Sequence, residues 1–234
     1  MSGDVEKLER INMAIAKEGL TLSEVLTLSA KKYTKLLNFS TDVQDKYKCM
    51  FEKIDSGKCS QKDKGILLEE LMYTLFHRGY SSLLVCGKNY RTSTNEIDLR
   101  ISWTEEAKYQ RFTEIYNCFG SSFLCECKNY DKKVDVTYVG KFYSLLATTD
   151  TNLGIMISWN GVTGRSPWSD ASGLIKKIAL RENRYIVVIN RNDLYQIYLG
   201  KTNIFALIDE KYNSLKEDIS YEQLVTAHEA QGNI

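Results

Sequence analysis

Proline and histidine are scarce in this chain. Pro167 is the single proline among 234 residues, whereas average usage would give roughly ten in a chain of this length. This scarcity excludes a proline-rich linker and a polyproline II segment. Only two histidines occur, His77 and His228, which leaves little material for a Cys/His zinc site or a Ser-His-Asp triad.

Long apolar runs and an excess of one charge sign are also lacking. No stretch of about 18 consecutive apolar residues is present, so we expect neither a membrane span nor a signal peptide. The 31 basic residues nearly balance the 30 acidic ones, and the net charge of +1 argues against a protein that coats nucleic acid by bulk charge. No GxxxxGK(S/T) P-loop occurs, so no nucleotide cofactor is expected.

The six cysteines include no CxxC pair. Without a secretion signal, we expect them to be reduced thiols in a cytoplasmic protein. Their predicted function is that of small, buried apolar side chains.

The residues that are present have the composition of a folded protein. Hydrophobic residues make up 43% of the chain and charged residues 26%, which excludes a mostly disordered chain. Residues 1–60 have apolar positions at helical spacing, which predicts an all-helical N-terminal region, a dimerisation or target-reading arm. Over residues 61–234, strand patterns alternate with helical ones, which predicts an α/β domain with a central mixed sheet flanked by helices.

Two segments place charged residues inside apolar strand patterns. Asp98 lies between two apolar residues, and the segment FLCECK carries Glu126 and Lys128. Successive side chains of a strand point to opposite faces, so Glu126 and Lys128 share a face. A strand-end ion pair and a solvent-facing acid on an edge strand are the simpler interpretations. If the two strands pair, however, Asp98 and Glu126 converge on one hard divalent cation.

A third acid and a long insertion complete this pattern. The apolar stripe of the helix predicted over residues 64–78 has Glu69 at its border and Glu70 nearly opposite. Glu69 is therefore expected to lean toward a site between helix and sheet, and ordinary helix surface is the alternative. Residues 104–122 are too many for a hairpin turn, and we expect them to form a lobe over the site or to contact substrate.

In this order, Leu68-Glu69, Ile97-Asp98 and Glu126-Cys127-Lys128 resemble the PD-(D/E)XK nuclease superfamily. More narrowly, the layout resembles Mrr-like restriction endonuclease domains over about residues 64–190. Further shared positions are Gly79-Tyr80, Val134, Val136, Val139, Phe142 and the strand that begins near Gly154. Two departures concern residues 93–96, where many members have a glycine-rich loop, and Glu126, where many have glutamine.

The resemblance implies a restriction-endonuclease-like fold and metal-dependent hydrolysis of DNA phosphodiester bonds, in restriction or phage defence. Asp98 and Glu126 would hold Mg²⁺, with Mn²⁺ able to substitute, and the backbone carbonyl of Cys127 would be a further ligand. Glu69 would act through a metal-bound water or as another ligand. Lys128 would assist the attacking water and the transition state. Lys141 is either a phosphate contact or a solvated surface lysine.

The expected partner is duplex DNA, and the expected assembly is a homodimer, because cutting two strands needs two active sites. The catalytic pattern would serve an RNase or a branched-DNA (junction) nuclease equally well. A non-catalytic nucleic-acid-binding subunit with a nuclease-like fold is the alternative from another functional class.

Overall fold

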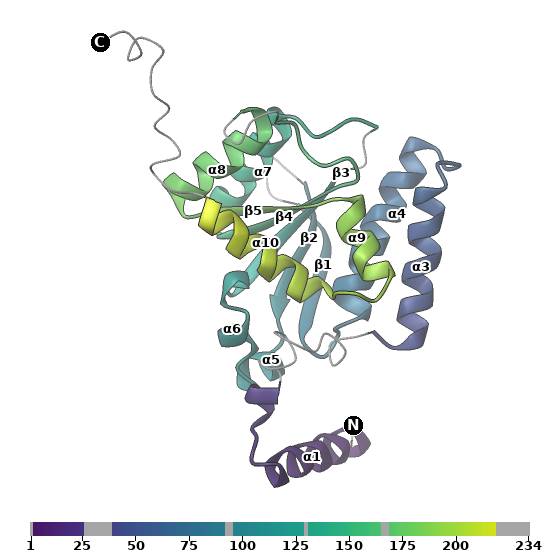
Figure 1. Ribbon diagram of the computed structural model, residues 1–234, viewed down its shortest axis with the longest axis vertical. Coiled ribbons are helices and arrows are strands. Elements are labelled where there is room, and N and C mark those ends of the chain that lie inside the picture. The colour runs from purple at the N-terminus through teal and green to yellow at the C-terminus, as the bar shows by residue number, and fades with distance from the viewer. Residues whose placement is uncertain (1, 26–38, 92–95, 129–130, 165–168, 219–234) are drawn as a thin grey trace.

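The protein is described from a computed structural model that covers residues 2–25, 39–91, 96–128, 131–164 and 169–218 (Figure 1). The predictions that involve Pro167, His228 and the loop at residues 93–95 lie outside the described residues. Among the residues that are described, no helix is both long enough and apolar enough to cross a membrane.

A five-stranded mixed sheet forms the centre of the fold. Its strands lie in the order β1(Leu84–Arg91), β2(Glu96–Trp103), β3(Ser122–Lys128), β4(Leu153–Ser158) and β5(Tyr185–Ile189). β2 is antiparallel to both β1 and β3, whereas β3, β4 and β5 are parallel to one another. The central mixed sheet predicted from the sequence is confirmed, and β3 lies in its middle with a partner on each side.

Helices cover both faces of this sheet (Figure 1). On one face lie α7(Val136–Thr148) and α8(Asp170–Glu182), whose apolar residues form a cluster with β3, β4 and β5. The other face packs against α3(Thr41–Asp55), α4(Gln61–Tyr73), α9(Arg191–Tyr198) and α10(Ile204–Asp218). A π-helical turn, η2(Thr74–Arg78), extends α4. The α/β fold with flanking helices is therefore confirmed.

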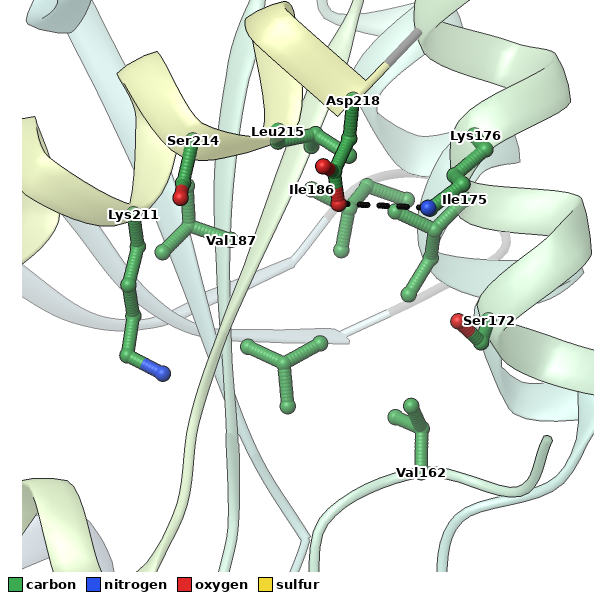
Figure 2. Close-up of a pocket in the computed structure, with 11 residues that line it drawn as sticks. Val162, Ser172, Ile175, Lys176, Ile186, Val187, Lys211, Ser214, Leu215 and Asp218 are labelled. Carbon is green, nitrogen blue, oxygen red and sulfur yellow. Dashed lines mark hydrogen bonds and ion pairs between the residues drawn. The ribbon is translucent and has the colours of Figure 1, made fainter. Parts of the chain in front are cut away.

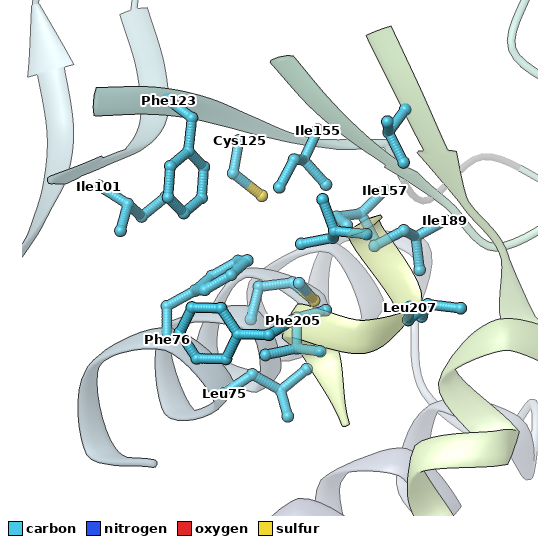
Figure 3. Packing of buried hydrophobic residues seen from close by; sticks show 14 of the residues in the cluster. Leu75, Phe76, Ile101, Phe123, Cys125, Ile155, Ile157, Ile189, Phe205 and Leu207 are labelled. Carbon is cyan, nitrogen blue, oxygen red and sulfur yellow. The ribbon is translucent and has the colours of Figure 1, made fainter. Parts of the chain in front are cut away.

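Strand alternation divides the core between the two faces. Phe123, Cys125 and Cys127 belong to the cluster beneath α4 and α10, whereas Leu124 belongs to the cluster beneath α7 and α8. The Phe123 ring is 5.5 Å from the ring of Phe76, and Figure 3 shows the two side chains facing each other across the layer between sheet and helix. This packing on both faces fixes the position and register of β3.

The N-terminal helices differ in how they contact the rest of the chain. In α3, Tyr47 and Phe51 are buried in the main core, and the Tyr47 hydroxyl donates a hydrogen bond of 2.7 Å to the carbonyl of Leu194. In α1(Ser2–Lys17), Val5 and Ile11 are more than half exposed. The domain boundary at residue 60 stays a prediction, but α3 packs as part of the body of the protein.

The insertion between β2 and β3 does not form a lobe over the predicted site. It contains α5(Glu105–Tyr109), α6(Phe112–Ile115) and the short helix η3(Asn117–Phe119), and it joins the end of β2 to the start of β3. Asp98 and Glu126 lie near the other ends of these strands. The expected lobe was wrong because aromatic side chains of the insertion, among them Phe112, Tyr116 and Phe119, complete the core there. Contact of the insertion with substrate stays a prediction.

Close packing of β4 against α7 gives the first testable prediction. A Cβ at Gly154 would lie 2.6 Å from Cε1 of Phe142 and 2.8 Å from Cδ1 of Leu146. We expect Gly154→Ala to lower the free energy of unfolding by about 1–3 kcal/mol, because the core must shift to accept the methyl group. Urea denaturation measures this change.

Gly140→Ala in α7 is the matched control for this substitution. Its added Cβ would meet no atom of the described chain within 4 Å. Helix propensity predicts a gain in stability of up to about 1 kcal/mol for this variant. If Gly154→Ala were as stable as the wild type, the close packing described here would be contradicted.

Candidate active site

The pairing of β2 with β3 brings the two predicted strand acids together. Leu99 pairs with Cys125 in an antiparallel register, so the register places Asp98 opposite Glu126. The Oδ2 atom of Asp98 accepts a hydrogen bond of 2.6 Å from the backbone N–H of Cys127. β2 lies between β1 and β3, so the interpretation of Asp98 as a solvent-facing acid on an edge strand is wrong.

Lys128 lies next to the same carboxylates. Its Nζ atom is 2.5 Å from Oε1 of Glu126, as expected for two side chains on one face of β3. Glu126 is only 8% exposed, and its second oxygen, Oε2, is buried without a hydrogen-bond partner in the described structure. The ion pair therefore accounts for only one oxygen of a buried carboxylate.

Burial and charge act together on the protonation of Glu126. The pKa of Glu126 is raised from 4.5 to about 7, first by burial and then by the neighbouring Asp98 carboxylate, while Lys128 and the backbone N–H of Asp98 oppose this rise. A carboxylate in a low-dielectric site beside another carboxylate is costly to ionise. A cation bound at this site would therefore favour the charged form of Glu126.

Glu69 lies beside this group and contributes to a hollow in the surface. The hollow has a volume of about 480 Å³ and is lined by residues of α4 and by Cys127 and Lys128 at the end of β3. Glu69 is partly buried along its wall. Within the described residues, however, no three Asp, Glu, Cys or His side chains are grouped closely enough to hold a metal ion together. The structure therefore brings together two acids and Lys128, with Glu69 nearby.

The neighbouring Glu70 serves a different purpose. Its Oε1 atom is 3.3 Å from Nη2 of Arg78, and its Oε2 atom pairs with Lys88. These ion pairs join α4 and η2 to β1. The two adjacent glutamates thus point to different sides of α4, since Glu69 faces the hollow and Glu70 faces β1.

Tyr138 is a residue of this region that the sequence patterns did not identify. The Nζ atom of Lys128 is 5.9 Å from the centre of the Tyr138 ring, and that of Lys141 is 5.5 Å away. Lys141 itself is exposed, and it lies three residues from Tyr138, a spacing that places two side chains on one side of a helix. This spacing is the sequence signal that could have identified Tyr138, because it places the tyrosine beside Lys141.

A separate hollow lies between β5, α8 and α10 (Figure 2). Its volume is about 360 Å³, and an ion pair of 3.2 Å between Lys176 and Asp218 spans one side of it. None of the predicted site residues lines it. The convergence of Asp98, Glu126 and Lys128 thus occurs elsewhere, at the end of β3.

Comparison with known proteins agrees with this geometry. The family model described as restriction endonuclease (Mrr catalytic domain) matches residues 64–197, which is more than half of the chain. The match begins within α4 and ends within α9, so it includes Glu69, Asp98, Glu126, Lys128 and Lys141. A search of curated proteins finds no match. The chain therefore belongs to the Mrr-like restriction endonuclease family, whose catalytic domain is of the PD-(D/E)XK type.

Proposed function

We propose that this protein is a metal-dependent endonuclease that hydrolyses phosphodiester bonds of duplex DNA, in the cytoplasm, in restriction or phage defence. The observation that carries the proposal is the buried pairing of Glu126 with Lys128 beside Asp98, with no hydrogen-bond partner for Oε2 of Glu126 among the described residues. The family match to a restriction endonuclease domain supports the same conclusion.

The donor set fits a hard divalent cation. Mg²⁺ binds through one or two carboxylates and keeps several waters, so it needs no group of three acids. Asp98 and Glu126 would hold Mg²⁺ or Mn²⁺, the backbone carbonyl of Cys127 would be a further ligand, and Glu69 would act through a bound water. The cation would lower the pKa of the attacking water and neutralise charge on the phosphate.

Lys128 would act on the phosphate and on the attacking water. Its ammonium group pairs with Oε1 of Glu126, and Lys128 lines the same hollow as Glu69. An ammonium group has three N–H donors, so while paired with Glu126 Lys128 would also orient a water and stabilise negative charge as it develops on the phosphoryl oxygens. Lys141, next to the same tyrosine ring as Lys128, would contact a neighbouring phosphate.

Asp98 has a second effect through the backbone. Because its Oδ2 atom accepts the N–H of Cys127, it fixes the segment between Glu126 and Lys128. Loss of this carboxylate would therefore remove a metal ligand and loosen the position of both neighbours.

Plasmid cleavage in Mg²⁺ tests the proposed activity. We expect Asp98→Asn, Glu126→Gln and Lys128→Ala each to lower the cleavage rate by at least about 10²–10³-fold, because the two acids would hold the cation and Lys128 would stabilise charge on the reacting phosphate. Glu70→Gln is the matched control, because it changes an adjacent acid of α4 whose partners are Arg78 and Lys88. It should cleave at the wild-type rate.

Two results would refute the proposed activity. The first is cleavage that persists in EDTA, and the second is cleavage that the three substitutions leave unchanged while the proteins remain folded. A parallel panel of RNA and junction substrates identifies the preferred nucleic acid. Binding of DNA without binding of Mg²⁺ or Mn²⁺ in calorimetry would instead support a non-catalytic subunit.

The raised pKa of Glu126 gives a pH-dependent prediction for the metal-free protein. Between pH 4.5 and about pH 7, the unfolded chain ionises Glu126 while the folded protein keeps it protonated. The free energy of unfolding of the wild type should therefore fall relative to that of Glu126→Gln across this range and stay level above it. Urea denaturation in EDTA measures the difference, and a difference independent of pH would contradict the raised pKa.

We also propose that the protein is a homodimer and that α1 joins the two copies. One chain carries one set of Asp98, Glu126 and Lys128, whereas cleavage of both DNA strands needs two sets. Val5 and Leu8 lie on one stripe of α1 and are 58% and 38% exposed. Such a stripe is stabilised when a second amphipathic helix covers it, and a second copy of α1 presents the same stripe.

Light scattering after size-exclusion chromatography tests this assembly on the full-length chain. Leu8→Glu should convert the dimer to a monomer and shift plasmid products from linear toward nicked DNA, because a charge would be buried in the apolar contact. Arg10→Glu is the control, since helical spacing places Arg10 on the opposite side of α1. A wild-type monomer, or a Leu8→Glu dimer, would refute the interface.

A further inference from the structure

The hollow beside Lys128 is followed by a second one along the surface. The second hollow has a volume of about 310 Å³, and its lining includes Lys132, Lys133 and Tyr138. Gln61, the first residue of α4, lines both hollows. We call the two hollows together the α4 groove. It extends from the candidate catalytic residues to the start of α7.

A glycine on the wall of this groove has no explanation within the described chain. Gly65 lies in the interior of α4, where glycine is among the least favourable residues. A Cβ added there would meet no described atom within 4 Å, whereas at Gly79 it would lie 2.4 Å from a Phe39 carbon. Internal packing thus accounts for Gly79 but not for Gly65 or Gly140. Of these two, Gly65 alone lines one of the hollows, and a ligand that lies directly against the helix backbone would account for a glycine there.

The charges along the groove favour a ligand with repeated phosphates. Lys62 lines the first hollow, and the exposed Lys132 and Lys133 line the second. The two aspartates of the second hollow are engaged elsewhere. Asp131 is 3.9 Å from Lys64, and Asp135 accepts hydrogen bonds from the first backbone N–H groups of α7.

We propose that the backbone of the DNA strand being cleaved follows the α4 groove. Its sugar–phosphate chain lies against Gly65, and Lys132 and Lys133 bind phosphates next to the scissile one. Gly65 is then a positioning residue, because it lets the strand approach α4 closely enough to place its phosphate at Lys128. The inference rests on the proposed nuclease function and adds the path of its substrate.

The substitution Gly65→Ala tests the close approach, because stability and binding should change in opposite directions. Replacing a helical glycine by alanine should raise the melting temperature by about 2–4 °C. The methyl group should lower the affinity for a fluorescent DNA duplex at least 10-fold and raise KM to a similar extent. Gly140→Ala, which adds a methyl group to α7 in open space outside both hollows, should raise the melting temperature without changing either quantity.

The double substitution Lys132→Gln/Lys133→Gln tests the phosphate contacts. Each lost contact should reduce the slope of log affinity against log salt concentration by about 0.9, so the pair should reduce it by about 1.8. Lys108→Gln/Lys201→Gln removes two exposed lysines outside the groove and should leave the slope unchanged.

The outcomes distinguish this inference from the proposed function. If the wild type cleaves DNA but Gly65→Ala binds DNA as tightly and the lysine variant keeps the wild-type slope, the groove path is refuted and the nuclease function stands. If the wild type never cleaves DNA, but Gly65→Ala lowers the affinity for DNA and the lysine variant reduces the salt slope, the groove path is supported and catalysis is refuted.

Discussion

The buried carboxylate of Glu126 is the group on which the rest of the site depends. It is almost entirely removed from water and lies beside Asp98. One of its oxygens pairs with Lys128, and the other has no hydrogen-bond partner in the part of the chain that the structure describes. Such a group is unfavourable unless something compensates for its charge. Lys128 compensates in part, and a divalent cation shared with Asp98 would complete the compensation. We infer that the buried carboxylate makes the metal-free protein less stable, and that it also holds the oxygens of Asp98 and Glu126 in position for a metal.

The sheet makes this arrangement possible because it holds β3 from every side. β2 pairs with β3 in an antiparallel register that brings Asp98 to the Cys127 backbone, and β4 holds the opposite edge in a parallel register. Phe123 anchors the strand in the aromatic core on one face, and Leu124 packs against the α7 and α8 side. A strand fixed at both edges and on both faces can hold two charged side chains at its end without changing register.

Local patterns predicted the sheet and the central residues of the site from the sequence. The alternation in FLCECK predicted that Glu126 and Lys128 share a face, and the apolar pattern around Asp98 predicted a second strand whose pairing with the first would bring the acids together. What could not be predicted depends on contacts between distant residues. The burial of Tyr47 against Leu194 joins positions 147 residues apart, and the path of residues 104–122 depends on an aromatic core formed by several elements. The groove was missed for the same reason, since its walls come from α4, β3 and the start of α7.

A crystal of the protein soaked in Mn²⁺ would show directly whether Asp98 and Glu126 form a cation site next to Lys128, at the end of β3. We expect an anomalous-scattering peak between the two carboxylates, within bonding distance of an oxygen from each. Well-ordered Asp98 and Glu126 side chains with no peak between them would contradict it.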